Sequence, residues 1–308
     1  MSGLHAGLRD YLALRRKLGY TLKETEWLLT SFVAWLEEHG ETHITTARAL
    51  AWAARPAGAD RRWHQRRLGV ARGFARHLAA IDPQTEVLPA GLLPAVCTRT
   101  TPYLYSRADI TALLAAAAAL SPPLRAATYQ TLIGLLAVTG MRIGEAIALD
   151  GADVGDKAML LTIRKAKPGS ARTVPLHPTT VEALDRYARL RDEQFPDPRT
   201  AAFFASTRGT RLAYSDANKT FRALTRAAGL EGRGGQRRPR AHDLRHSFAV
   251  ATLLRWQQAG ADVDARLPLL SAMLGHADPA STYWYLQAAP ELLAIAARRL
   301  QHILAEPA

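Results

Sequence analysis

The sequence predicts a mainly helical protein of two domains, the second of which contains a small β-hairpin. The chain has 308 residues, and single hydrophobic cores rarely grow much beyond about 250 residues. Apolar residues recur every three or four positions along most of the chain, which is the periodicity of amphipathic helices. This periodicity stops in a proline-rich segment between residues 82 and 102. We therefore expect a helical domain over residues 1–81, a stretched linker over 82–102 and a second domain over 103–308.

Four helices are predicted in the first domain. A capping box, Thr21-Leu-Lys-Glu24, is expected to open the second helix, and its apolar stripe includes Trp27 and Phe32. Thr45 and Thr46 are candidate caps for the third helix. The fourth helix, near residues 60–80, alternates basic and aromatic side chains: Arg61, Arg62, Trp63, Arg66, Arg67, Arg72, Phe74 and Arg76. This composition fits a DNA-binding helix, and it also fits a solvated basic face.

The second domain is predicted to hold the hairpin and the remaining helices. Ser106, with Asp109 three residues later, has the pattern of a helix N-cap. Two β-prone runs, 160–163 and 172–176, flank Lys167-Pro-Gly-Ser170, which predicts a hairpin with a glycine-containing turn. Helices are expected at residues 125–138, from 142, at 179–191, 216–228 and 242–260, and from Pro268 to the end.

The charge of the chain indicates a polyanionic partner. Forty lysines and arginines oppose 27 acidic residues, which gives a formal charge of +13, and only six of the cations are lysines. The planar guanidinium of arginine suits bidentate phosphate binding. Nucleic acid is therefore the expected partner, with the codon bias of an arginine-rich genome as the alternative explanation.

Cysteine content and hydropathy exclude several classes of protein. The single cysteine, Cys97, excludes an intrachain disulfide framework and a cysteine-based zinc site. The N-terminus lacks the apolar segment of a signal peptide. The longest apolar stretches, 113–120 and 132–138, are shorter than the roughly 20 residues that span a bilayer. We expect a cytoplasmic, nucleoid-associated protein without a membrane partner.

Two segments place arginines at the start of predicted helices. In the first, residues 139–149, Gly140 permits a tight turn before Arg142, and Glu145 follows three residues later. Taken alone, this pattern favours a structural Arg–Glu pair. In the second, Ala241 to Phe248, His242 and Arg245 lie three residues apart on one helix face. Both side chains are therefore expected to reach a single phosphate.

A third segment combines histidine and tyrosine. Leu274-Gly-His276 forms a predicted turn, and Tyr283 and Tyr285 stand at the head of the helix expected after Pro279. A single histidine in such a position is more often structural than catalytic. The three segments therefore carry more information together than separately.

Together, the segments resemble the tyrosine recombinase, or phage integrase, family. Thr-Gly-Met-Arg-Ile-Gly-Glu, His-Asp-Leu-Arg-His-Ser-Phe-Ala and Leu-Gly-His match the family's three boxes in their order and spacing. The resemblance covers roughly residues 103–300, and residues 1–81 match the family's core-binding domain in position and character. It implies a two-domain DNA clamp that performs site-specific cutting and rejoining of DNA. The sequence looks most like those of integrases carried on bacterial transposable elements.

The resemblance also implies roles for individual residues. Tyr285 would attack a DNA phosphodiester and leave a 3′-phosphotyrosyl bond and a free 5′-hydroxyl. Arg142 and Arg245 would hold the non-bridging oxygens, His242 would exchange the proton of the tyrosine, and His276 would hydrogen-bond the scissile phosphate. No cofactor and no metal are implied, because the arginines supply the charge that Mg²⁺ supplies elsewhere.

A lysine on the hairpin completes the family's catalytic set by protonating the leaving 5′-oxygen. Lys167 stands eight residues before Pro175, which is the usual family spacing, and Lys165 stands ten before it. Strand alternation puts both lysines on one face. Lys167 is the expected acid, although the family's common Lys-x-Gly-Lys pattern is absent from this hairpin.

Tyr283 competes with Tyr285 for the role of nucleophile. Two residues apart on a helix, the side chains point about 200° apart, so only one can face the phosphate. The spacing of nine residues from His276 selects Tyr285. Tyr283 and Trp284 are then expected to pack in the core.

The expected partners are double-stranded DNA and other copies of the chain, assembled as a tetramer on two DNA sites, with accessory proteins possible. A terminal amphipathic helix over residues 290–304 is expected to pack either on its own domain or on a neighbouring protomer. A type IB topoisomerase, which shares the catalytic pocket, is the nearest alternative function. The others are a metal-dependent phosphohydrolase built on His242, Asp243, His246 and His276, and a DNA-binding protein without catalysis.

Overall fold

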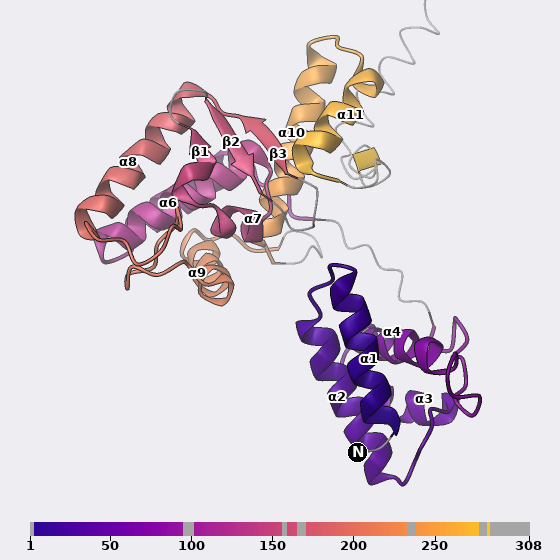
Figure 1. The fold of residues 1–308 in the computed structure, drawn as a ribbon. Coiled ribbons are helices and arrows are strands. Elements are labelled where there is room, and N and C mark those ends of the chain that lie inside the picture. Colours follow the sequence, from indigo (N-terminus) through magenta and orange to yellow (C-terminus); the bar gives the residue numbers. More distant parts are fainter. Residues whose placement is uncertain are drawn as a thin grey trace, which may run out of the picture. The chain divides into compact units, whose positions relative to one another are not determined.

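The computed structural model describes residues 3–94, 102–155, 159–164, 171–232, 238–276 and 282–283. The chain divides into two compact units, Met1–Arg99 and Thr100–Ala308 (Figure 1). Each unit has a hydrophobic core of its own. The predicted fold class, mainly helical with one small sheet, is confirmed.

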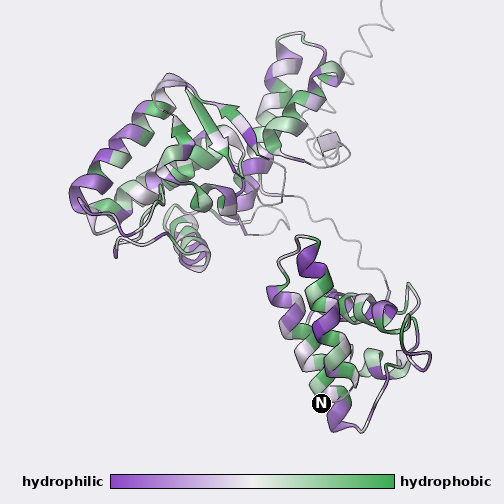
Figure 2. Ribbon diagram, viewed as in Figure 1, coloured by the Kyte–Doolittle hydropathy of each residue, from purple (hydrophilic) through white to green (hydrophobic). Residues whose placement is uncertain are grey.

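In the described part of the first unit, four helices enclose the core. They are α1 (Gly3–Lys17), α2 (Lys23–Glu38), α3 (Thr46–Ala54) and α4 (Arg61–Leu78). Phe32, Trp52 and Phe74 are buried between them, and Figure 2 shows hydrophobic helix faces turned toward the interior of this unit. Thr45 caps α3 as predicted, because its Oγ1 accepts a hydrogen bond from the Arg48 backbone N–H at 3.3 Å.

Two predictions for this unit are wrong. The segment Thr21–Glu24 does not form a capping box, since α2 follows Leu22, whose side chain makes no capping hydrogen bond. The Glu24 carboxylate instead pairs with Arg66 of α4 at 2.5 Å. Trp27 is 61% exposed, because the buried face of α2 is centred on Leu28 and Phe32.

The expected linker is also shorter than predicted. Leu88 is 1% exposed and belongs to the core of the first unit. The backbone N–H of Glu86 donates to the Ile44 carbonyl at 2.8 Å, and its carboxylate accepts from the Thr46 N–H at 2.8 Å. Residues 82–94 therefore pack on the first unit, because their polar groups find partners there and Leu88 is removed from water. Residues 95–101 lie outside the described part.

The described part of the second unit is built around a central helix. This helix, α6 (Pro123–Thr139), packs against α5 (Arg107–Ala118), α8 (Pro178–Gln194) and α10 (Ala241–Gln258). The other helices are α7 (Ile143–Ala148), the 3-10 turn η1 (Gly151–Asp153), α9 (Tyr214–Ala227) and α11 (Val263–Leu274). The predicted cap of α5 is confirmed, since Ser106 and Asp109 form a reciprocal capping box.

The predicted hairpin is confirmed in its strands, which belong to a three-stranded antiparallel sheet. The strand order is β1 (Val154–Gly155), β2 (Leu160–Ile163) and β3 (Arg172–Pro175). Leu161 pairs with Val174, and Ile163 pairs with Arg172. Leu161, Ile163 and Val174 are buried in the core. Arg172 shares this buried face because side chains alternate along a strand.

The last described helix starts earlier than predicted. α11 begins at Val263 behind an Asp262 cap, whose carboxylate accepts from the Ala265 N–H at 3.0 Å, so Pro268 lies inside the helix. Proline removes one backbone hydrogen bond. Burial of Leu267 and Leu270, at 2% and 0% exposure, outweighs that loss. The helix predicted over residues 290–304 lies outside the described residues.

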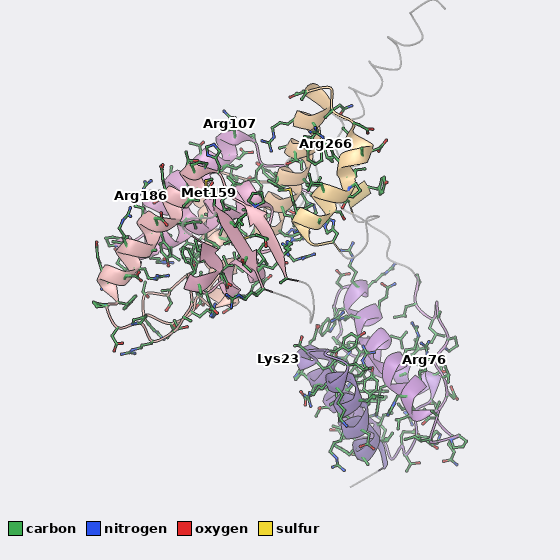
Figure 3. The ribbon with its side chains drawn as sticks, turned by 45° about the horizontal axis from the view of Figure 1, so that its top comes forward. Lys23, Arg76, Arg107, Met159, Arg186 and Arg266 are labelled. Atoms are coloured by element: carbon green, nitrogen blue, oxygen red, sulfur yellow. The ribbon has the colours of Figure 1, made fainter. Side chains whose placement is uncertain are left out.

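Basic side chains are exposed on both units. Figure 3 shows Lys23 and Arg76 on the first unit, and Arg107, Arg186 and Arg266 on the second; all five are exposed. Among the described residues, no helix is long and apolar enough to cross a membrane.

Candidate active site

Arg142 is held at the start of α7 by a carboxylate. Gly140 ends α6 in the left-handed conformation, with φ of +62°, and a Cβ there would lie 2.4 Å from the Phe248 ring of α10. Oε2 of Glu145 accepts from the Arg142 backbone N–H at 2.8 Å, and its Oε1 accepts from Nη1 of the same arginine at 2.8 Å. The predicted Arg–Glu pair therefore exists. The Arg142 side chain remains 40% exposed, so its guanidinium can also reach a ligand.

Glu145 has a second arginine partner, which the sequence analysis missed. Arg172 on β3 donates from Nη1 to Oε1 at 3.1 Å and from Nη2 to Oε2 at 2.7 Å. Burial raises the pKa of Glu145, but hydrogen bonds from Arg172 and Arg142 outweigh it and lower the pKa to about 2. The strand pattern held a signal for this contact, because Arg172 has the same parity as the core residue Val174, and a buried arginine needs an anionic partner.

The α10 segment brings Arg245 to the turn that precedes Arg142. The Arg245 side chain is buried, with 2% exposure, and its Nη1 donates to the Gly140 carbonyl at 2.9 Å. At the start of α10, the Asp243 carboxylate accepts hydrogen bonds from the Arg240 backbone N–H at 2.9 Å and from its Nη2 at 2.8 Å. The first and second segments singled out in the sequence therefore meet in space.

The two histidines of the site are neutral at pH 7. Burial, followed by the charge of Arg245, lowers the pKa of His242. Burial, followed by the nearby Arg245 and Arg142, lowers the pKa of His276 to about 4. Nδ1 of His276 lies 2.8 Å from the Thr282 hydroxyl. Thr282 is itself buried, with 1% exposure.

The third segment joins the site through the end of α11. Nη2 of Arg142 lies 3.5 Å from the Gly275 carbonyl, which places His276 next to the first segment in space. The structure thus brings together Arg142, His242, Arg245 and His276. Because both histidines are neutral, the net charge comes from Glu145 and three arginines. Arg142, Arg172 and Arg245 contribute +3 and Glu145 contributes −1, which gives +2. Such a cluster suits a phosphate group.

The remaining candidates are placed as follows. Lys165, Lys167 and Tyr285 lie outside the described residues. Tyr283 is 50% exposed, so the prediction that it packs in the core is wrong; Thr282 fills the buried position instead. Within the described ranges, no group of three or more histidine, cysteine, aspartate or glutamate side chains is placed to hold a metal ion.

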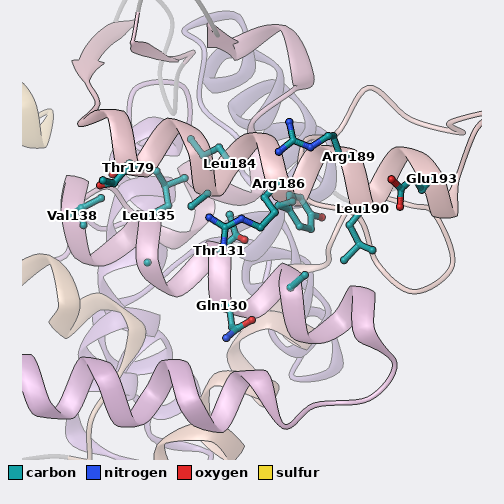
Figure 4. A pocket seen from close by; sticks show the side chains of 15 residues that line it. Gln130, Thr131, Leu135, Val138, Thr179, Leu184, Arg186, Arg189, Leu190 and Glu193 are labelled. Carbon is teal, nitrogen blue, oxygen red and sulfur yellow. The ribbon is translucent and has the colours of Figure 1, made fainter.

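A separate groove of about 580 Å³ lies between α6 and α8. In Figure 4, Thr131 and Leu135 of α6 face Leu184 and Arg186 of α8 across it. None of the four assembled site residues lines this groove.

Comparison with known proteins identifies the family. The model of the phage integrase family matches residues 106–291. A Sinorhizobium fredii protein that is named as an integrase/recombinase, y4rB, is 45% identical over 98% of both chains. The chain therefore belongs to the phage integrase family. It is a tyrosine-type site-specific recombinase, an enzyme that cuts and rejoins DNA, and the alternative functions are not favoured.

Other relatives of this recombinase agree. Tyrosine recombinase XerD of Mycobacterium tuberculosis is 30% identical over 92% of the chain and 86% of that protein. The Tn1549 transposon integrase, solved in complex with transposon right-end DNA, superposes with a TM-score of 0.67 at 16% identity, over 97% of this chain and 99% of that one. XerH, bound to a palindromic difH substrate, gives a TM-score of 0.66 at 20% identity, over 88% of this chain and 77% of that one. At these identities the two structures show a shared fold.

Proposed function

We propose that the recombinase breaks DNA by forming a phosphotyrosyl bond to Tyr285, in a pocket built by Arg142, His242, Arg245 and His276. The convergence of two arginines and two neutral histidines from three distant segments carries this proposal. The two guanidinium groups suit the non-bridging oxygens of a phosphodiester, where negative charge grows in the transition state.

In the proposed reaction, the Tyr285 oxygen attacks phosphorus, and the bond from phosphorus to the 5′-oxygen breaks. The phenol proton passes to His242, whose lowered pKa keeps it neutral and able to accept a proton. Lys167 gives a proton to the departing 5′-oxygen. Because the 3′-phosphotyrosyl bond replaces the phosphodiester bond, a 5′-hydroxyl of another strand can reverse the attack without ATP.

His276 is proposed to orient the phosphate. With Nδ1 engaged by the Thr282 hydroxyl at 2.8 Å, Nε2 is the nitrogen left to face the substrate. The contact with the hydroxyl thereby holds the imidazole ring in one orientation, as hydrogen-bond partners of functional histidines commonly do.

Double-stranded DNA is the proposed partner, and both units are proposed to bind it. The net charge of +13 supports this, as do the exposed arginines of α4, Arg61, Arg66 and Arg76. Assembly of four protomers on two DNA sites is part of the proposal. A lambda integrase tetramer bound to a Holliday junction shares the fold, with a TM-score of 0.59 at 19% identity over 90% of this chain and 78% of that one. We also propose that the recombinase acts on the ends of a mobile element.

Covalent trapping tests the nucleophile. The DNA that flanks the gene for this chain is cut into fragments, nicked so that a short 5′-hydroxyl fragment diffuses away, and incubated with the recombinase. We expect protein–DNA adducts on a denaturing gel for the wild type and Tyr283→Phe, and none for Tyr285→Phe. Adducts formed by Tyr285→Phe but not by Tyr283→Phe would assign the reaction to Tyr283.

A sulfur substitution tests the proposed acid. A thiolate leaves without a proton, so a 5′-bridging phosphorothioate removes the need for a general acid, whose contribution is commonly 10²- to 10⁴-fold. Lys167→Ala should be slow on ordinary DNA and largely rescued on this substrate, whereas Lys165→Ala should be affected little on either. The reverse pattern would assign the proton transfer to Lys165.

A further inference from the structure

Arg172 on β3 is an almost buried arginine that joins three elements of the site. Its Nε donates to the Met273 carbonyl in the last turn of α11 at 2.9 Å. Its two terminal nitrogens donate to the two carboxylate oxygens of Glu145 in α7, at 3.1 and 2.7 Å. The side chain is 14% exposed, and it is therefore committed to protein partners rather than to solvent.

The end of α11 is shaped to receive this guanidinium. Gly275 has φ of +67°, and a Cβ at that position would lie 2.6 Å from Nη1 of Arg172 and 2.8 Å from its Cζ. The Met273 carbonyl is one of the last four of the helix, which have no partner within the helix. Arg172 supplies that partner, and His276 follows directly after the residue on which the guanidinium rests.

The charges show why one glutamate needs two arginines. Glu145 is 4% exposed and stays ionised at neutral pH, with a pKa of about 2. If Arg142 were its only partner, the carboxylate would cancel the positive charge that Arg142 presents to a phosphate. With Arg172 forming the bidentate pair, Glu145 still orients Arg142 through the backbone N–H and Nη1, and the cluster keeps its excess positive charge.

We propose that Arg172 is a positioning residue of the recombinase. It neutralises Glu145 and joins β3, α7 and the end of α11, so that Arg142 and His276 face one phosphate. This inference rests on the proposed function of those two residues. It also links β3 to the phosphate site, and Lys167 precedes Arg172 by five residues in the sequence.

The test separates this role from a structural one by comparing single-turnover rates of adduct formation at saturating DNA, on the trapped fragment described above. Arg172→Met should lower the rate about 10- to 100-fold, by analogy with the residues that orient metal-ligating side chains, with DNA affinity changed less than about threefold. Arg172→Lys keeps the charge without the planar fork, and its rate should be intermediate.

A second variant keeps the test decisive even if Arg172→Met is poorly folded. In Arg172→Met with Glu145→Gln, no unpaired carboxylate competes for Arg142, so the double variant should react faster than Arg172→Met alone. Arg191→Met is the matched control, because Arg191 is 16% exposed and paired with Asp192 but is remote from the four site residues in its contacts. It should lower stability and leave the rate unchanged.

A DNA-free measurement distinguishes failure of this inference from failure of the proposed function. Removal of the Arg172 charge should raise the pKa of His276 above about 4, the value that Arg172 helps to depress, as followed by NMR of the imidazole ring. Arg191→Met should not change it. An unchanged His276 pKa in Arg172→Met, or rates equal to the wild type in every Arg172 variant, would overturn the positioning role. If the wild type itself forms no adduct, the proposed function fails, and the titration still decides the position of Arg172.

Discussion

The two units bury charged groups for different purposes. Among the described residues of the first unit, Arg67 is the one charged residue that is buried, whereas the second unit buries Asp109, Glu145, Asp153, Asp243 and Arg245. Asp109 and Asp153 belong to local capping boxes. Asp243 likewise pairs locally, with Arg240 three residues earlier, whereas Glu145 and Arg245 contact segments that are distant in the sequence. Buried charge that connects distant segments, rather than buried charge as such, marks the functional region.

The buried arginines make the contrast concrete. Arg67 packs its guanidinium 3.7 Å from the centroid of the Trp52 ring and donates to the Trp52 carbonyl at 2.7 Å. Both contacts are internal to one helical body. Arg245 donates to the turn that carries Arg142, so its burial positions a second segment. The same residue type supports folding in one unit and belongs to the proposed phosphate site in the other.

The largest expected effect is on the rate of covalent adduct formation and concerns the second unit. Arg245→Ala should lower the single-turnover rate of adduct formation by about 10²- to 10³-fold, because one donor to the developing charge is lost. Arg67→Met, which also removes a buried arginine, should leave that rate unchanged. Equal losses of rate in both variants would show that burial alone, not the site, explains the effect.

The next effect is on DNA affinity and concerns the first unit. Removal of residues 1–94 should weaken binding by about 100-fold or more and flatten its salt dependence, since each lost phosphate contact reduces the log–log slope by about 0.9. The cut belongs after residue 94, because residues 82–94 pack on the first unit. Gel-shift titrations at several salt concentrations provide the measurement. Undiminished affinity would contradict the clamp.

Lowering the pH should destabilise the second unit, because the folded state holds the pKa values of His276 and Glu145 below their ordinary values. His276 has a folded-state pKa of about 4, below its ordinary value of 6.5, so its contribution to stability is complete above pH 6.5 and is lost as pH falls toward 4. Glu145, with a pKa of about 2 in place of 4.5, acts in the same direction below pH 4.5. Calorimetry between pH 7 and 4 should show a falling transition temperature, and His276→Gln should reduce the fall. An identical profile in that variant would exclude His276 as the cause.

The smallest effect is a change of stability in the first unit. Arg67→Met removes a cation–π contact and one of the two donors to the Trp52 carbonyl, which also accepts from the Arg55 backbone N–H. The variant should lower the free energy of unfolding by about 1–3 kcal/mol. Exposed Arg61 is the control, and Arg61→Met should change the free energy by less than about 0.5 kcal/mol. Urea unfolding measures both. A loss of DNA affinity in Arg67→Met without a loss of stability would instead place Arg67 at the DNA surface.

Local patterns predicted much of the fold, and they failed where tertiary contacts compete. The cap at Thr45 and the capping box of Ser106 were readable because each involves residues within one turn. Thr21 failed as a cap because Glu24 has a partner on another helix, Arg66. Trp27 fits the helical periodicity, yet periodicity does not tell which side of a broad apolar stripe meets the core.

The sequence by itself determined the family and the mainly helical fold, and its motifs named Arg142, His242, Arg245 and His276 as the residues proposed for the site. These features are readable because they depend on residue type and on spacing within one or two turns of the chain. Only the tertiary structure decided that Arg172 shares Glu145 with Arg142 and that the Thr282 hydroxyl contacts His276. An ion pair requires its two partners to meet in space, and Glu145 and Arg172 stand 27 residues apart on different elements. A separation of 27 residues in the sequence matches no helix or strand period. The folding of the intervening chain brings the two side chains together.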